Sequence, residues 1–493
     1  MPIFNEWLDG QVGKTYFNFI NGEWASGSTG ETFEIFNPAK KGQVLGYFQA
    51  STEEDVNQAV QAAHQAFKSW SEEPGANRGA ILMKFADLLE LHSEELAFTL
   101  SAEQGKVLAE SKGEIGRAVK ETRFAAGEAL RVEGSTYPSE VRNISTTVMH
   151  RPLGVVAAIA PWNFPIVTPI RKIAPALAYG CTVVYKPASE TPWSSIRIME
   201  LLTEAGVPKG VVNLVTGGGA KVGNPLISHP LVKGISFTGS TSVGLGINEK
   251  AASLLKKTQL ELGGKNPAVV LDYEDAEYVA KQIVSAAFAC SGQRCTSISR
   301  VVVLKEKSEE IIQAIQKELK KIKVGPASDP ESTIGPLVSE DQLNTTIDYV
   351  NIGKEEGAQL VYGGEVLTDG KFSEGYYVEP ALFTGVLSDM RIASEEIFGP
   401  VLSVQEVEDA KEALRVANNV KYGLAASVFT RDLSLAYQFV NELECGMVHV
   451  NHGTASQAHV PFGGVKESGF GAFSIGKTNK DFFTEMKVAY LQY

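Results

Sequence analysis

The sequence predicts an α/β fold with two successive domains, each built on a mainly parallel sheet. From residue 146 onward, short apolar runs rich in β-branched residues alternate with helical segments, and this alternation is typical of βαβ units. The first series of runs covers 155–160, 181–186, 211–216, 234–239 and 266–271. The second series covers 299–304, 358–364, 401–407, 424–430 and 446–451.

The first 130 residues differ in texture and indicate a short β region followed by helices. Ser51 precedes Glu54 by three residues, which is the spacing of a capping box, and the apolar residues of 51–70 follow helical periodicity. Two further helices are expected over about 77–103 and 109–133. The apolar stripe of each helix is most simply explained as core.

Composition restricts the function classes. The chain has 493 residues and a net charge of −13, so two to four domains are expected and an acidic surface argues against nucleic-acid or anionic-membrane partners. The first ten residues lack the basic region of a signal peptide, and the longest apolar run, 153–167, contains two prolines and is too short for a membrane span. We expect a soluble cytosolic protein.

The cysteines raise the question of a disulfide, a metal site or a nucleophile. They are Cys181, Cys290, Cys295 and Cys445. A reducing cytosol disfavours a disulfide, and zinc would need paired cysteines or clustered histidines. His449 and His452 lie in a predicted strand and turn, where alternation directs them to opposite faces, so no metal site is predicted. A nucleophile or simple buried thiols remain.

Three motifs supply groups for chemistry at a carbonyl. Cys295 follows Gly292-Gln-Arg, and a thiolate there would be a strong nucleophile. Glu261 lies among apolar residues before a Gly-Gly pair, where it is either a paired structural carboxylate or a general base. Asn163 follows an apolar strand between two prolines, and its amide is either an oxyanion donor or a turn residue.

Three further motifs suit a nucleotide. Gly239 and Ser240 open a helix directly after a strand, which is where phosphate groups bind. Lys186 ends a strand, and Glu396 precedes an aromatic residue and a Gly-Pro turn. The dinucleotide fingerprint G-x-G-x-x-G does not occur in a suitable context.

Taken in order, these motifs resemble the aldehyde dehydrogenase superfamily. The resemblance extends from "FINGEW" at 19–24 to "PFGGVKESGFG" at 461–471, and its most specific parts are E-L-G-G-K-N-P and G-Q-R-C. It implies a Rossmann-like coenzyme domain, a catalytic α/β domain and a small β arm for assembly into a homodimer or homotetramer. The corresponding ranges are 1–133 with 153–263, 264–464, and 134–152 with 478–493.

The resemblance also implies a mechanism and an NAD or NADP coenzyme. Cys295 would attack a small aldehyde, Asn163 and the Cys295 N–H would hold the oxyanion, Glu261 would activate water, and Lys172 would relay protons. Lys186 and Glu396 would bind the two ribose units, and Gly239 with Ser240 the pyrophosphate. Further coenzyme contacts are implied for Ile159, Pro161, Trp162, Ser189, Gly263 and Phe398, and substrate contacts for Phe164, Arg171 and Thr296.

Two departures and one arginine bear on specificity. Ser189 stands where many strictly NAD-using members carry a glutamate, so we expect NADP to be accepted about as well as NAD. After "KESGFG" the chain reads "AFSIG" in place of the usual Arg-Glu. Arg171 matches a substrate-binding arginine of succinic semialdehyde dehydrogenases, although an arginine there could equally pair with a protein carboxylate.

The sequence around Cys295 and the ending "KDFFTEMK" are more similar to α-ketoglutaric semialdehyde (2,5-dioxopentanoate) dehydrogenases. An ω-carboxylated semialdehyde is therefore the expected substrate, with 2,5-dioxopentanoate first and succinic semialdehyde second. A broad-range aldehyde dehydrogenase and a catalytically silent structural member of the superfamily remain as alternatives.

Overall fold

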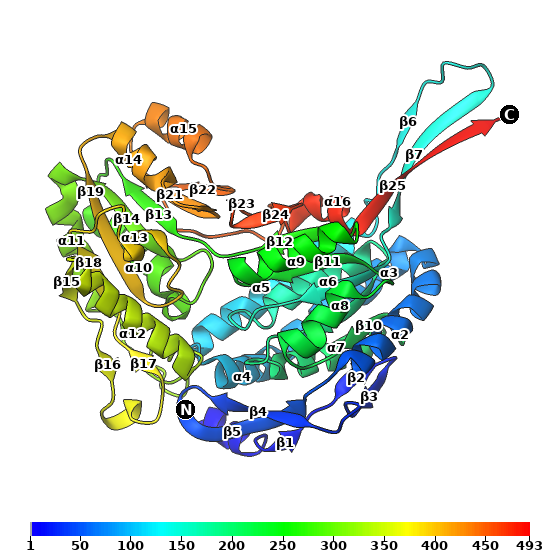
Figure 1. The fold of residues 1–493 in the computed structure, drawn as a ribbon, viewed down its shortest axis with the longest axis horizontal. Coiled ribbons are helices and arrows are strands. Elements are labelled where there is room, and N and C mark those ends of the chain that lie inside the picture. The colour runs from blue at the N-terminus through cyan, green and yellow to red at the C-terminus, as the bar shows by residue number, and fades with distance from the viewer. Residues whose placement is uncertain (1) are drawn as a thin grey trace.

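The computed structural model describes residues 2–493 and contains two large sheets (Figure 1). The eight-stranded sheet has the order β24-β12-β11-β8-β9-β10-β2-β3. Its parallel strands are β8 (Val155–Ile159), β9 (Thr182–Lys186), β10 (Val212–Leu214), β11 (Val232–Thr238) and β12 (Lys257–Glu261). Its antiparallel edges are β24 (Gly469–Gly471), β2 (Asn18–Ile20) and β3 (Glu23–Ala25).

The seven-stranded sheet has the order β15-β18-β19-β14-β13-β21-β22. Its parallel strands are β13 (Asn266–Val270), β14 (Ile298–Leu304), β18 (Ala381–Thr384), β19 (Val401–Val407), β21 (Ala425–Phe429) and β22 (Met447–Val450). Only β15 (Gln359–Tyr362), at the edge, is antiparallel among the described strands of this sheet. The predicted α/β class with two mainly parallel sheets is confirmed.

Two strand predictions need correction. The run 266–271, counted with the first series, lies in the seven-stranded sheet as β13. The strand that completes the parallel part of the first sheet is β12, which was not predicted because its sequence, KTQLE, is too polar to stand out. It is nevertheless buried over its last three residues, which end at Glu261.

Helices cover both sheets (Figure 1). Around the first sheet lie α2 (Glu53–Glu72), α3 (Gly75–Leu91), α4 (Ser93–Gln104), α5 (Leu108–Glu128), α6 (Val167–Ala178), α7 (Trp193–Ala205), α8 (Asn224–Ser228) and α9 (Thr241–Ser253). Around the second lie α10 (Ala276–Phe288), α11 (Lys305–Leu319), α12 (Glu340–Glu355), α13 (Arg391–Ser394), α14 (Ala410–Asn418) and α15 (Leu433–Glu442). The terminal helices are α1 (Pro2–Asp9) and α16 (Asn479–Phe483). No helix of residues 2–493 has the length and apolar character needed to cross a membrane.

The expected helix boundaries are partly wrong. The N-cap of α2 is Thr52 and not Ser51, and its capping box closes on Asp55, whose carboxylate accepts from the Thr52 N–H at 2.8 Å. The predicted helix 77–103 is two helices, α3 and α4, separated at His92.

Smaller sheets complete the chain. A three-stranded sheet near the N-terminus is formed by β1 (Lys14–Thr15), β5 (Lys40–Gln49) and β4 (Thr32–Asn37). Two ribbons pair β16 (Val366–Leu367) with β17 (Tyr377–Val378) and β20 (Tyr422–Gly423) with β23 (Val465–Lys466). An antiparallel sheet of β6 (Ser135–Tyr137), β7 (Ile144–Pro152) and β25 (Thr484–Gln492) projects from the body, with the C-terminus near its tip (Figure 1).

The first sheet positions the site through the carboxyl ends of its parallel strands. Strands β8 and β9 are buried along their whole length, so their ends are fixed by the core. Because parallel strands end at the same edge of a sheet, the segments after β8, β9, β11 and β12 come together there. Asn163 and Gly239 lie in these segments, and Lys186 and Glu261 are the last residues of β9 and β12.

Candidate active site

Two cavities meet at the nucleophile candidate. The Trp162 cavity, with about 680 Å³ of empty space, extends from Trp162 toward Ser240 and Glu396. The Phe164 cavity, with about 980 Å³, extends from Phe164 toward α5. Asn163, Thr238 and Cys295 line both cavities. Molecules bound in the two cavities would therefore approach each other at the Cys295 thiol.

The loop that carries Cys295 is held from several sides. The Asn266 amide donates to the carbonyl oxygens of Cys295 and Ser297, each at 2.8 Å. A Cβ at Gly264 would lie 2.7 Å from the Cys295 carbonyl oxygen, and a Cβ at Gly292 would lie 2.3 Å from the Gly399 carbonyl oxygen. Close backbone approach thus explains Gly264 and Gly292 of the two motifs. The two hydrogen bonds to the loop explain Asn266.

The surroundings of Cys295 favour the protonated form of its thiol. Burial, together with the negative charges of Glu261 and Glu396, raises its pKa to about 12. The surroundings of the thiol therefore do not by themselves produce the thiolate that would be a strong nucleophile. A base must remove the proton before the sulfur reacts.

Glu261 and Lys172 are two buried groups of opposite charge, and each influences the pKa of the other. Glu261 is the last residue of β12; its Oε1 accepts from the Ser474 N–H at 3.4 Å, and its Oε2 has no hydrogen-bond partner among residues 2–493. Lys172 on α6 donates to Thr238 Oγ1 at 2.7 Å. Burial raises the pKa of Glu261 and lowers that of Lys172. Neither residue lines the two cavities, so Glu261 must turn from Ser474 to reach a water near Cys295.

Asn163 is fixed at the meeting point. Its Nδ2 donates to the Gln293 carbonyl at 2.9 Å, and Lys106 Nζ donates to the Asn163 carbonyl at 2.8 Å. The buried amide therefore keeps one N–H for an acceptor in the cavities, as an oxyanion donor requires.

The Trp162 cavity collects most of the residues expected to contact a coenzyme. Its lining includes Pro161, Trp162, Gly239, Ser240, Gly263, Glu396 and Phe398. Ile159, Lys186 and Ser189 do not line it. Lys186 pairs with Ile159 across β9 and β8, and its Nζ donates to the Pro187 carbonyl at 2.7 Å. The Ser189 hydroxyl lies 3.5 Å from the Gly217 carbonyl oxygen.

The groups of this cavity fit a dinucleotide. Ser240 is the N-cap of α9, and within the described chain no side chain caps the first turn, so backbone N–H groups are available for a pyrophosphate. Glu396 accepts from the Gly264 N–H at 2.9 Å, and burial raises its pKa to about 7. A Cβ at Gly263 would lie 2.1 Å from Glu396 Oε2, so this carboxylate occupies the space that only glycine leaves.

Three residues that line this cavity were not predicted, namely Thr238, Leu262 and Gln342. Gln342 on α12 lines it and donates to the carbonyls of Ile397 and Phe398 at 3.1 and 3.0 Å. Phe398 has a positive φ of 58° and packs edge-on against Trp162 at 5.3 Å. Gln342 thereby holds the segment after Glu396, and its place in a polar helix gives no sequence signal for this role.

The Phe164 cavity contains the three expected substrate residues and several others. Phe164, Arg171 and Thr296 line it. Unpredicted charged residues also line it, namely Lys106, Glu110, Glu114, Arg117 and Arg294. Lys106 lies in the short segment between α4 and α5, and Glu110, Glu114 and Arg117 lie on α5, a helix that the sequence marks only as core-forming.

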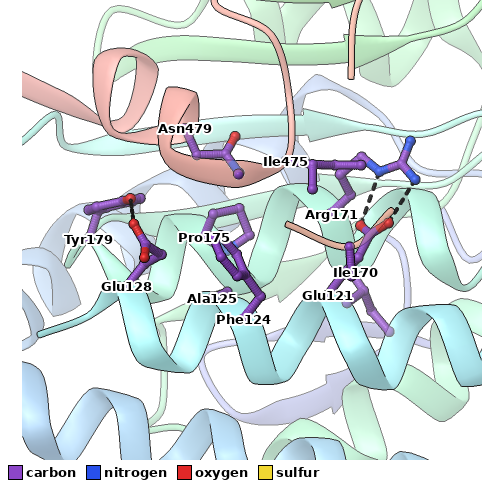
Figure 2. Close-up of a pocket in the computed structure, with 12 residues that line it drawn as sticks. Glu121, Phe124, Ala125, Glu128, Ile170, Arg171, Pro175, Tyr179, Ile475 and Asn479 are labelled. Atoms are coloured by element: carbon purple, nitrogen blue, oxygen red, sulfur yellow. Dashed lines mark hydrogen bonds and ion pairs between the residues drawn. The ribbon is translucent and has the colours of Figure 1, made fainter. Parts of the chain in front are cut away.

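Arg171 is paired with a protein carboxylate. Its Nε and Nη2 donate to the Glu121 carboxylate at 3.1 and 2.9 Å, and its guanidinium lies 4.8 Å from the centre of the Phe462 ring. Figure 2 shows Arg171 on α6 facing Glu121 on α5. The two hydrogen bonds of Arg171 leave its Nη1 nitrogen unused in the described chain, so part of the guanidinium stays available to a ligand.

The prediction that His449 and His452 point to opposite faces is wrong. The rings of His449 and His452 lie 5.0 Å apart, edge to face. Strand β22 ends at Val450, and Asn451 has a φ of 60°, so alternation stops before His452. Within residues 2–493 no group of three or more His, Cys, Asp or Glu side chains is placed to hold a metal ion.

Comparisons with known proteins agree with this site. The model of the aldehyde dehydrogenase family matches residues 24–489. The chain is 43% identical to an α-ketoglutaric semialdehyde dehydrogenase of Bacillus subtilis, over 97% of this chain and 98% of the relative. It is 39% identical to a 2,5-dioxopentanoate dehydrogenase of Saccharolobus solfataricus, over 95% and 98%.

The fold comparison is equally extensive. A betaine aldehyde dehydrogenase of Staphylococcus aureus, solved in complex with NAD⁺, superimposes with a TM-score of 0.97 at 34% identity and covers 100% of this chain and 98% of its own. The expected Rossmann-like and catalytic architecture is confirmed by this likeness. The chain therefore belongs to the aldehyde dehydrogenase family.

Proposed function

We propose that this enzyme oxidises 2,5-dioxopentanoate to 2-oxoglutarate with NAD(P). Relatives that match almost the full chain are named for this substrate. The structural observation that carries the proposal is the Arg171 guanidinium, which lines the same cavity as the Cys295 thiol and keeps one nitrogen without a protein partner. Guanidinium groups bind carboxylates well.

The charge of the Phe164 cavity supports a substrate with a carboxylate. Among its described lining residues four are basic and two are acidic: Lys106, Arg117, Arg171, Arg294, Glu110 and Glu114. The Lys106 ammonium pairs with Glu114 at 2.7 Å. Burial raises the pKa of Glu110, which favours its neutral form. The remaining positive charge would attract an anionic aldehyde and would give no advantage to a neutral one.

The chain's own residues account for the chemistry. Glu261, with its raised pKa, accepts the thiol proton, directly or through a water. Cys295 Sγ then bonds to the aldehyde carbon, and the oxyanion is held by the Asn163 amide and the Cys295 backbone N–H. The bound coenzyme supplies the hydride acceptor. Glu261 passes the thiol proton to Lys172, which hands it on through Thr238, so that the Glu261 carboxylate is ionised again. Glu261 then takes a proton from the water that attacks the Cys295 thioester, and the carbon–sulfur bond breaks to release the acid and the Cys295 thiolate.

The coenzyme selectivity follows from Ser189. A glutamate at this position would repel the 2′-phosphate of NADP, whereas a serine carries no charge. We therefore propose that NADP serves about as well as NAD, with Lys186 and Glu396 at the two ribose units and the first turn of α9 at the pyrophosphate.

The β arm supports a homo-oligomer. Strand β25 of this sheet exposes large apolar side chains, including Met486, Val488 and Tyr490, as expected of a surface that a second copy covers. We assign 134–152 and 478–493 to the arm, 1–133 with 153–263 to the coenzyme domain and 264–464 to the catalytic domain. A homodimer or homotetramer in the cytosol is proposed; replacing both Met486 and Tyr490 by lysine should reduce the mass measured by light scattering.

A comparison of substrates tests the function. We expect kcat/KM for 2,5-dioxopentanoate to exceed that for pentanal, which has the same carbon number, by more than about tenfold, or 1.4 kcal/mol. Succinic semialdehyde should fall between them. Preference for succinic semialdehyde would move the assignment to that substrate, and equal values for all three aldehydes would indicate a broad-range enzyme. Absence of any NAD(P)-dependent oxidation would favour the silent structural alternative.

A further inference from the structure

Arg117 is one of three arginines that line the Phe164 cavity, together with Arg171 and Arg294. It lies on the face of α5 that also presents Glu110, Gly113 and Glu114, at helical spacings of three, four and seven residues. This whole face lines the cavity that contains Cys295. Arg117 therefore lies about two turns along α5 from Glu110, farther down the same wall.

The hydrogen bonds of Arg117 leave one nitrogen unused. Its Nε donates to Glu121 Oε1 at 2.6 Å, and its Nη1 donates to the Ser456 carbonyl. Its Nη2 is buried and has no hydrogen-bond partner in the described chain. A buried donor without an acceptor destabilises the structure, so an acceptor brought by a ligand would remove this cost.

Glu121 connects Arg117 with Arg171. The carboxylate accepts from Arg117 Nε and from Arg171 Nη2 through Oε1, and from Arg171 Nε through Oε2. Its side chain is only 5% exposed, against 19% for Arg117 and 12% for Arg171. Two guanidinium groups thus share one carboxylate, which leaves a net charge of +1 in a poorly hydrated place.

We propose that Arg117 binds the substrate carboxylate together with Arg171, with Glu121 holding the two guanidinium groups in position. Arg117 Nη2 is buried without a hydrogen-bond partner in the described chain, and the two hydrogen bonds of Arg171 leave its Nη1 unused. These two nitrogens supply the N–H groups. A carboxylate offers two oxygens to two donors and neutralises the excess charge. This inference rests on the proposed function, because it requires a substrate with a terminal carboxylate.

A purely structural role for Arg117 makes a different prediction. Through the Ser456 carbonyl, Arg117 also links α5 to the loop that follows β22. If this were its entire role, substitution would disturb the cavity for every aldehyde, and charged and neutral substrates would lose activity together. Binding of the carboxylate instead predicts a selective loss, so the ratio of two substrates separates the roles.

The test uses the full-length enzyme with saturating NADP. The quantity measured is kcat/KM for 2,5-dioxopentanoate divided by kcat/KM for pentanal, in the parent, Arg117→Gln and Arg117→Lys. We expect Arg117→Gln to lower this ratio at least about tenfold, mainly through a higher KM for the charged aldehyde. Arg117→Lys keeps the positive charge but loses the paired N–H groups of the guanidinium, so its ratio should lie between those of the parent and Arg117→Gln.

The matched control is Arg123→Gln. Arg123 lies on the same helix but faces solvent and pairs with Asp87 and Glu90, so its ratio should equal that of the parent. An unchanged ratio in Arg117→Gln would overturn the inference. Should that variant fail to fold, an unchanged ratio in Arg117→Lys would do the same. A parent enzyme without preference for the charged aldehyde would instead contradict the proposed function.

Discussion

The Asn266 side chain holds the backbone of Cys295, through the 2.8 Å hydrogen bond from its amide to the Cys295 carbonyl oxygen. The same amide reaches the Ser297 carbonyl, and its oxygen accepts from the Ala425 N–H on β21 at 3.0 Å. The nucleophile is thus tied to the second sheet, although its chemistry takes place at the edge of the first.

Replacing Asn266 should therefore harm catalysis more than coenzyme binding. Asn266→Ala removes three hydrogen bonds, of about 1 kcal/mol each, and frees the Cys295 loop. We expect kcat to fall about 10- to 100-fold because the thiol loses its position. The NADP dissociation constant, followed by fluorescence titration, should change less than about threefold. An equal loss in both quantities would show that Asn266 supports the whole site.

The nucleophile is tested by Cys295→Ser. A serine hydroxyl is a much weaker nucleophile than a thiolate and needs a stronger base, so kcat should fall at least about a thousandfold while NADP still binds. Cys445→Ser is the matched control, because Cys445 lies just before β22 and lines neither of the two cavities. Turnover of the Cys295→Ser enzyme at the parental rate would eliminate the thioester mechanism.

The sequence was sufficient for most of the parallel strands, although not for β12 and β18, and for the residues at the strand ends, because these carry local signals. Short β-branched runs predict β8, β9 and β11, and glycine-containing motifs mark the places of close backbone approach, as at Gly263 and Gly264. Motif order then predicts the family. These features depend on residues that are close together in the sequence.

The contacts between distant segments could not be predicted in this way. The pairing of Arg171 with Glu121 depends on how α5 packs against α6, and neither residue has a sequence signal for it. The contact of His449 with His452 depends on a single positive φ at Asn451. Strand β12 was missed because its burial comes from the fold and not from apolar residues.

Gly263 offers a steric test of the coenzyme site. In Gly263→Ala the new Cβ would lie 2.1 Å from Glu396 Oε2, so the carboxylate must move away from its present position. We expect the NADP dissociation constant to rise at least about tenfold. Gly246→Ala on α9 is the control, because a Cβ there meets nothing within 4 Å, and its binding should equal that of the parent.

Coenzyme preference is tested at Ser189. The parent should use NAD and NADP with kcat/KM values within about tenfold of each other, since an uncharged serine does not repel the 2′-phosphate. Ser189→Glu should lower kcat/KM for NADP more than about tenfold and leave that for NAD largely intact. A parent enzyme that prefers NAD by more than about a hundredfold, or 2.7 kcal/mol, would contradict the assignment.

The pH dependence should report on Glu261. Burial is the largest cause that raises the pKa of this carboxyl from its ordinary value of 4.5. The ionised form is the base, so kcat falls as the pH drops through the raised pKa and is retained above it. The acidic limb of the kcat profile should consequently lie well above the range of an ordinary glutamate, whereas a limb near that range would exclude Glu261 as the group that titrates.

Glu261→Gln should uncouple the two half-reactions. If residual deprotonation of the thiol still permits acylation, hydrolysis of the thioester becomes slow, and stopped-flow absorbance should show a burst of reduced coenzyme approaching one per active site before a slow steady state. Glu249→Gln, an exposed change on α9, should show the steady-state rate of the parent. Fast steady-state turnover by Glu261→Gln would assign water activation to another group, and Lys172, which burial makes less basic than an ordinary lysine, would then be the residue to replace.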